Sequence, residues 1–301
     1  MVINVRGRWR RLPKNGWGVR KRRRVLFRSR NLLRGAGSDM KALAIADMSK
    51  NLATLVTFLR NARKILIFTG AGISTSSGIP DFRGPEGVWT RRKPVYYDDF
   101  MGSEAARMEH WDYKMESWEV FRNAHPNAVH HATVKLERAG RLLAVLTQNI
   151  DGLHAKAGTS PHRLVELHGT NAVVECQSCH ERTHPEPHFE YFREHRKAPR
   201  CNCGGFLKTA TISFGQALDP NALQRANKAT EETDLVVAMG STLSVHPAAS
   251  FPLQAAERGI PYVIVNRGVT DHDDGPYVSL RLEGEVSQIF PPAVELALLA
   301  S

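Results

Sequence analysis

A short apolar run that ends in closely spaced glycines is the feature that most restricts how this chain can fold. The run covers residues 64–69 (KILIFT), and Gly70-Ala71-Gly72 follow it directly. Apolar spacing from Leu52 to Leu59 predicts a helix before this strand. The same alternation continues, with strands expected at 142–146, 235–239 and 262–265 and helices at 127–138, 246–258 and 286–299. Strands that alternate with helices predict an α/β fold with a Rossmann-like, doubly wound parallel sheet.

Two stretches interrupt this alternation and predict a smaller second module. A helical pattern at residues 104–122 lies within an insert at about 96–125, and all four cysteines lie within about 173–205. The Rossmann-like parts are then expected at about 50–95, 126–172 and 206–301. A chain of 301 residues is long enough for one large domain with such an insert or for two domains.

The positive charge of the chain is concentrated at its N-terminus. Residues 1–38 contain 13 Lys and Arg and no acidic residue, whereas residues 39–301 contain 28 basic and 30 acidic residues. A run of like charges of this kind favours a disordered basic extension at 1–38. A nucleic-acid-binding tail, an organelle transit peptide and a true start at Met40 or Met48 are the alternatives.

Composition excludes several classes of protein. Hydrophobic residues make up 42% and charged residues 24% of the chain, which is typical of a globular protein and not of a disordered one. No apolar run approaches the ~20 residues of a membrane-spanning helix, and the apolar core of a secretory signal is missing. We therefore expect a cytoplasmic protein with no membrane partner.

The glycine loop predicts a nucleotide-binding site. Glycines between a strand and a helix let the backbone approach a pyrophosphate, and the helix N-terminus then faces the anion. The dehydrogenase fingerprint requires a third glycine where Thr75 stands, and the acidic residue expected about 20 positions further on is absent. A nucleotide site is therefore expected, but not that of an ordinary NAD dehydrogenase. A purely structural turn is the alternative.

The four cysteines predict a metal site. Cys176 and Cys179 form one close pair, and Cys201 and Cys203 form another. Four thiolates in two close pairs match a tetrahedral zinc site, and four protein ligands leave no open position for chemistry. The prediction is one structural zinc, with Gly204-Gly205 allowing the tight turn after the second pair. A redox disulfide or four free thiols are the alternatives.

Eight segments of distinctive composition occur in one order along the chain. They are GAGIST (70–75), SGIPDFRGPEGVW (77–89), TQNIDGLH (147–154), ELHG (166–169), the four-cysteine module, ISFGQ (212–216), MGSTLSV (239–245) and VIVNRG (263–268). In order and spacing they resemble the bacterial-type sirtuin family of NAD-dependent protein lysine deacylases. The resemblance covers about 53–290 and implies a catalytic domain at 39–301 that uses NAD.

The resemblance also implies the catalytic residues. His168 follows an apolar run at an expected strand end and matches the family's general base toward a ribose hydroxyl, a role that suits the pKa of histidine. Asn149 matches the residue that positions water or the nicotinamide ribose. Asp151 matches the residue that binds the nicotinamide carboxamide, and a helix N-cap is its alternative role.

The cofactor-binding residues that the resemblance implies come from five parts of the chain. They are Gly70, Ala71, Gly72 and Ile73 in the glycine loop, Asp81, Phe82, Arg83 and Trp89 in the loop after it, Gln148, Asn149, Ile150 and Asp151 after the strand at 142–146, and Gly240, Ser241, Asn266, Arg267 and Gly268 at two later strand ends. Phe82 is expected to shield the reactive ribose carbon from water. For the two later strand ends, ordinary turns are the alternative.

Two further segments match those between which sirtuins hold an extended substrate peptide by strand addition. They supply Phe214 and Gly215 from one side and Ser244 and Val245 from the other. Phe214 is expected to line an apolar tunnel for the stem of the acylated lysine; a core position is its alternative. The acyl oxygen then attacks the nicotinamide ribose, nicotinamide leaves, and O-acyl-ADP-ribose is released. A protein mono-ADP-ribosyltransferase and a non-catalytic, DNA-bound zinc module are the rival functions.

The helical insert predicts the preferred acyl group. Sirtuins that act on succinyl-lysine resemble one another in a Tyr-x-x-Arg pair, whereas here Tyr113 is followed three positions on by Glu116. Lys114 is adjacent to Tyr113 and is expected to point away from the pocket. Uncharged acyl groups should therefore be preferred over succinyl, unless Arg107 or Arg122 reaches the pocket.

Overall fold

The large lobe is built on a six-stranded parallel sheet. The structure is a computed structural model that describes residues 2–3, 9–10, 36–81 and 93–299. The strand order is β11-β10-β9-β3-β4-β5, and the strands are β3 (Ile65–Thr69), β4 (Leu142–Thr147), β5 (Leu164–Glu166), β9 (Leu235–Met239), β10 (Tyr262–Asn266) and β11 (Leu280–Glu283). The chain adds strands on one side of β3 first and on the other side later. The carboxyl ends of β3 and β9 are therefore the switch point, where doubly wound sheets bind ligands.

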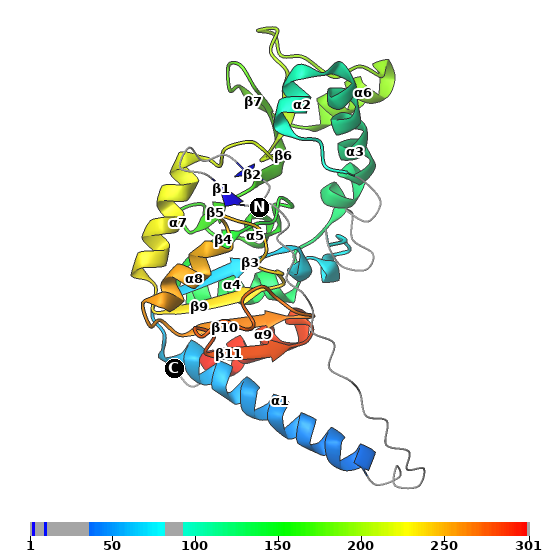
Figure 1. The fold of residues 1–301 in the computed structure, drawn as a ribbon. Helices are drawn as coiled ribbons and strands as arrows, with labels where there is room; N and C mark the ends of the chain where they lie inside the picture. Colours follow the sequence, from blue (N-terminus) through cyan, green and yellow to red (C-terminus); the bar gives the residue numbers. More distant parts are fainter. Residues whose placement is uncertain (1, 4–8, 11–35, 82–92, 300–301) are drawn as a thin grey trace, which may run out of the picture.

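Helices cover both faces of this sheet (Figure 1). One face packs against α1 (Ala36–Asn61), α4 (Ala128–Arg138) and α9 (Val286–Leu298), and the other packs against α7 (Pro220–Glu232) and α8 (Ser250–Glu257). Ile65 and Ile67 of β3 point to the first face and Leu66 and Phe68 to the second. Because the central strands β3, β9 and β10 are buried on both faces, they are continuous apolar runs and not alternating ones.

The small lobe lies at one end of the large lobe (Figure 1). Its antiparallel sheet has the order β7-β6-β8, with β6 (Gly169–Cys176), β7 (Arg182–Thr183) and β8 (Leu207–Thr211). The helices α2 (Tyr97–Gly102), α3 (Glu104–Asn123) and α6 (Glu186–His195) complete it. Trp111 and Trp118 of α3 pack against Phe189 and Phe192 of α6 in its core. The expected second module is thus confirmed as a separate layer with its own apolar cluster.

Some element boundaries differ from those expected. Helix α1 begins at Ala36, well before the expected apolar spacing, and α8 begins at Ser250 and not at residue 246. Residues 246–249 form a turn because the residue before a proline, here His246, disfavours helical backbone. The expected disorder and nucleic-acid contact at 1–38 fall mostly outside the described residues, which there comprise β1 (Val2–Ile3), β2 (Trp9–Arg10) and the start of α1.

In the described part of the chain, no helix combines the length and apolar character needed to cross a membrane. The expected cytoplasmic location stays a prediction.

Candidate active site

The glycine loop lies against the end of β9 at the switch point. Gly70 N donates to Met239 O at 3.0 Å, and Gly72 N donates to Gly240 O at 2.8 Å. A Cβ atom on Gly72 would lie 2.8 Å from the Cα atom of Gly240. The two strand ends therefore touch backbone to backbone, which only glycines allow. The expected α-helix after the loop is wrong: two 3-10 turns, η1 (Ala71–Ile73) and η2 (Thr75–Ser77), follow instead.

A cavity of about 420 Å³ opens at the carboxyl edge of the sheet and extends to the small lobe. Fifteen predicted site residues line it, namely Gly70, Ala71, Gly72, Asp81, Gln148, Asn149, Ile150, His168, Phe214, Gly240, Ser241, Val245, Asn266, Arg267 and Gly268. Four others lie close by but outside its lining, namely Ile73, Asp151, Gly215 and Ser244. Phe82, Arg83 and Trp89 lie outside the described residues. The segments that the sequence brings forward are thus assembled around one space.

His168 follows β5 and borders the cavity. Its Nδ1 atom lies 3.1 Å from the main-chain oxygen of Gln148. Because a carbonyl oxygen only accepts hydrogen bonds, this contact assigns the proton of the neutral ring to Nδ1 and a lone pair to Nε2. Nε2 is therefore the atom that can take a proton. The main-chain oxygen of His168 also accepts from Ile212 N at 2.8 Å, which ties the histidine to the segment that carries Phe214.

Asn149 and Asp151 are held by a buried cluster of hydroxyl groups. Ser74 Oγ donates to Asp151 Oδ2 at 2.7 Å, and Asn149 Nδ2 donates to Ser74 Oγ at 3.2 Å. Asp151 Oδ1 also accepts from Leu153 N at 2.9 Å, but the N-cap of α5 (Leu153–Ala157) is Gly152, so Asp151 holds the start of this helix from one residue before the cap and the alternative N-cap role is not observed. Burial raises the pKa of Asp151, and these hydrogen bonds oppose the rise. Asp151 thus supports the site from behind Ser74.

The two segments expected to hold a peptide border the cavity from different lobes. Phe214 is half-buried, and its main-chain oxygen accepts from Tyr97 N at 2.9 Å. Its ring lies 5.9 Å from the ring of Tyr96. Val245 lines the cavity from the other side, after the buried Leu243. Phe214 is thus a wall of the cavity, in contrast to the alternative core position.

The end of β10 forms the wall of the cavity that lies away from His168. Asn266, Arg267 and Gly268 line it, and Arg267 Nη1 pairs with Glu285 Oε1 at 2.7 Å. Asn266 Nδ2 donates to the main-chain oxygens of Arg267 and Gly268 at 3.1 and 3.0 Å. Glu285, which the sequence reasoning missed, also lines the cavity. It comes directly after Gly284, which also lines the cavity, and this glycine was the available signal.

Lys114 lies in the cavity wall, so the expectation that it points away is wrong. Tyr113 and Lys114 both line the cavity, because it extends over more than one row of side chains on α3. Lys114 Nζ donates to Asn171 Oδ1 at 2.8 Å, and burial, with the nearby Lys208, lowers the pKa of Lys114 to about 7. The two arginines considered for the pocket make other contacts. Arg107 donates to Phe100 O and Met101 O, and Arg122 pairs with Glu186. The preference for uncharged acyl groups stays a prediction.

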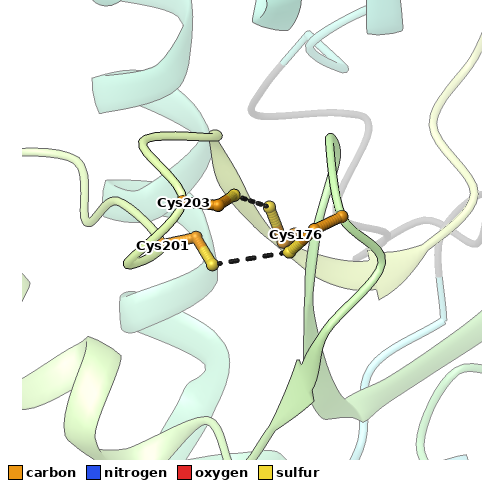
Figure 2. Close-up of side chains that lie close together, drawn as sticks. Cys176, Cys201 and Cys203 are labelled. Atoms are coloured by element: carbon orange, nitrogen blue, oxygen red, sulfur yellow. Dashed lines mark hydrogen bonds between the residues drawn. The ribbon is translucent and has the colours of Figure 1, made fainter.

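The four cysteines converge in the small lobe, and Figure 2 labels three of them, Cys176, Cys201 and Cys203. Their Sγ atoms lie within 4.8 Å of one another, with 3.5 Å between Cys176 and Cys203 and 3.7 Å between Cys179 and Cys201. Zinc with Zn–S bonds of about 2.3 Å requires sulfur atoms about 3.8 Å apart, so the cluster fits a tetrahedral zinc. A Cβ atom on Gly205 would lie 2.6 Å from Cys176 Sγ, which confirms the need for glycine in this turn.

The zinc cluster is structural because of where it lies. Strand β6 begins next to His168 and ends at Cys176, so roughly 25 Å of strand separates the cluster from the histidine. Four protein ligands also leave no position for a substrate. The cluster therefore fastens β6 to the segment before β8 and takes no part in the chemistry of the cavity.

A doubly wound parallel sheet with a glycine-lined switch point and a zinc-bearing lobe defines a dinucleotide-binding α/β protein with an inserted metal module. Comparison with known families narrows this class: the model of the Sir2 family matches residues 70–247. The chain belongs to the Sir2 family.

Named relatives and solved structures agree with this assignment. The NAD-dependent protein deacetylase of Rhodopseudomonas palustris is 41% identical over 229 residues, which cover 76% of this chain and 90% of that protein. NAD-dependent protein deacetylase 1 of Bradyrhizobium diazoefficiens is 41% identical over 233 residues, covering 77% and 91%. The fold is similar to that of a solved Sir2–p53 peptide–NAD+ complex, with a TM-score of 0.72 at 33% identity, covering 81% of this chain and 97% of that one.

Proposed function

We propose that this chain is an NAD-dependent protein lysine deacetylase that releases nicotinamide and O-acyl-ADP-ribose. The observation that carries the proposal is the single cavity in which the glycine loop, Asn149 and His168 meet Phe214 and Val245. Groups suited to a dinucleotide, a general base and an acyl-lysine stem thus share one space. Relatives that match most of this chain are named NAD-dependent protein deacetylases.

NAD fits the glycine side of the cavity. Gly72 and Gly240 let the two strand ends touch backbone to backbone, so this side of the cavity is bounded by main chain that a pyrophosphate could approach. Asn266, two strands from β3 on the side away from His168, is placed for the ribose of the adenosine half. Gln148 and Asn149 lie on the His168 side and suit the nicotinamide half. When bound, NAD supplies an electrophilic ribose carbon and a leaving group.

The chain's own residues supply proton transfer and positioning. His168 Nε2 accepts a proton from a ribose hydroxyl, while the bond from Nδ1 to Gln148 O keeps the ring in the required tautomer. Asn149 is fixed by Thr147 Oγ1, which accepts from its main-chain nitrogen at 3.0 Å. Phe214 and Val245 enclose the acyl-lysine stem, whose charge the acyl group has removed. We assign these roles within a catalytic domain at 39–301, with 1–38 as an extension.

The test is nicotinamide release with an acetylated and an unmodified form of the same lysine peptide. We expect release only with the acetylated peptide, and a loss of at least about 100-fold in His168→Ala, the usual contribution of a general base. His131→Ala, at an exposed position on α4, is the matched control and should keep full activity. Equal turnover in His168→Ala and the wild type would reject the role of His168. Release without acetylated peptide, with ADP-ribosylated protein as product, would favour the transferase alternative.

A further inference from the structure

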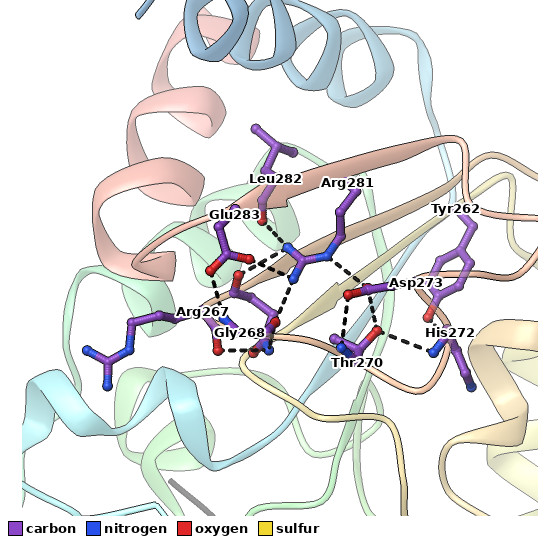
Figure 3. A network of polar contacts seen from close by, with 10 residues as sticks. Tyr262, Arg267, Gly268, Thr270, His272, Asp273, Arg281, Leu282 and Glu283 are labelled. Carbon is purple, nitrogen blue, oxygen red and sulfur yellow. Dashed lines mark hydrogen bonds and ion pairs between the residues drawn. The ribbon is translucent and has the colours of Figure 1, made fainter. Parts of the chain in front are cut away.

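Arg281 is a partly buried residue of β11 whose guanidinium group is fully engaged in hydrogen bonds (Figure 3). Its side chain is 22% exposed. Nη1 donates to Asn266 O at 3.1 Å, and Nη2 donates to Gly268 O at 2.6 Å. One planar group therefore binds the main-chain oxygens at both ends of the turn 266–268, which lines the cavity.

Two carboxylates fix the direction of this guanidinium group. Arg281 Nε donates to Asp273 Oδ1 at 2.8 Å, and Nη2 donates to Glu283 Oε2 at 2.9 Å. Burial alone would raise the pKa of Asp273, but hydrogen bonds from Thr270 and Arg281 hold it below its usual value. The carboxylate therefore stays charged and keeps Arg281 in place. Glu283 Oε1 also accepts from Gly268 N at 2.7 Å, so the same carboxylate holds the turn from its other side.

Arg281 itself does not line the cavity, among the residues that the structure describes there. Any influence on a ligand must therefore pass through the turn. Gly268 has a φ of +86°, and because glycine adopts positive and negative φ about equally readily, the contacts from Arg281 and Glu283 select this conformation. Because β10 and β4 lie on opposite sides of β3, this turn meets the half of a bound dinucleotide that lies away from His168.

We propose that Arg281 is a positioning residue for NAD, which holds the turn 266–268 in the conformation that receives the ribose of the adenosine half. This inference rests on the proposed function, since it requires that the cavity binds NAD. A lysine cannot replace the arginine, because an ammonium group lacks the planar fork that reaches two carbonyl oxygens and two carboxylates at once. The expected signature is a loss of affinity for NAD with the chemical step unchanged.

The experiment compares Arg281→Lys and Arg281→Gln with the wild type. We expect the KM for NAD to rise about tenfold in both variants, a typical size for coupling through a positioned segment, while kcat and the KM for the acetylated peptide stay unchanged. Calorimetry with ADP-ribose should show the same loss of affinity, and inhibition by free nicotinamide should be unaffected. Circular dichroism checks that each variant is folded.

Arg163→Lys is the matched control. Arg163 is also partly buried, also donates to two main-chain oxygens, those of Leu142 and Leu143, and also pairs with a carboxylate, that of Glu137. None of these residues lines the cavity. An unchanged KM for NAD and unchanged ADP-ribose affinity in both Arg281 variants would overturn the proposal, and so would an equal change in Arg163→Lys. If the wild type binds ADP-ribose but shows no turnover, the deacetylase function fails and the calorimetry still decides the role of Arg281.

Discussion

Gly240→Ala should destabilise the protein at the contact between the glycine loop and β9. Gly240 has a φ of +61°, and a Cβ atom there would lie 2.5 Å from Ile73 N and 2.7 Å from the carbonyl carbon of Gly72. The left-handed backbone costs an alanine about 1–2 kcal/mol, and the overpacked contact adds about 1–3 kcal/mol. Because both neighbours are backbone atoms, they cannot move aside without shifting the loop. The free energy of unfolding should therefore fall by roughly 2–5 kcal/mol.

Gly140→Ala separates the two contributions. Gly140 has a similar φ of +69°, but an added Cβ atom would meet nothing within 4 Å. This variant should lose only the backbone contribution of about 1–2 kcal/mol. The assay is urea unfolding followed by circular dichroism, together with calorimetry for ADP-ribose, whose affinity should fall in Gly240→Ala alone. Equal losses of stability in the two variants, or normal ADP-ribose binding in Gly240→Ala, would refute the argument from close approach.

Two further predictions concern the small lobe. Purified protein should contain about one equivalent of zinc. Cys201→Ser should lose both the metal and the fold of this lobe, which would appear as a red shift of the fluorescence of Trp111 and Trp118. A folded, metal-free variant would contradict the structural role of the zinc. Burial lowers the pKa of Lys208 to about 7 from 10.5. Between these values the unfolded chain keeps a proton that the folded chain has released, so stability contributed by this group rises with pH by up to about 1.4 kcal/mol per pH unit. Urea unfolding at several pH values above 7 should therefore show the free energy of unfolding of the wild type rising relative to that of Lys208→Met. An equal pH dependence of the two free energies would exclude the effect.

The centre of the large lobe was predictable because its central strands are buried on both faces. The runs that became β3, β9 and β10 are continuously apolar and end in glycine or asparagine, so their type and boundaries can be read directly. Helix α7 was missed because its fully buried side chains, Ala226, Ala229 and Thr230, are small, so its stripe toward the sheet is only weakly apolar. The four-residue edge strand β11 was missed because Arg281 interrupts its apolar pattern.

Side-chain direction was the part of the site that sequence spacing could not predict. Spacing placed Asp151 and Asn149 correctly at the end of β4, but it could not show that Asp151 turns behind Ser74 while Asn149 lines the cavity. The burial of Lys114 and Lys208 was equally hidden, because lysines are rarely buried. Only the folded chain brings their acceptors, Asn171 for one and the main-chain oxygens of β8 for the other, within reach.

The antiparallel pairing of β6 and β8 allows residues to be inserted in the outer part of the small lobe without a change at the cavity. Gly169 pairs with Thr211, and Ile212 N donates to His168 O. These contacts lie next to the cavity and set the spacing between His168 and Phe214. Extra residues added further out do not have to be accommodated by His168 and Phe214. The exposed residues Arg196 and Lys197, at the end of α6, are therefore suited to the insertion of a tag or a fused domain. Such a fusion would be attached to the small lobe and would leave the lining of the cavity unchanged.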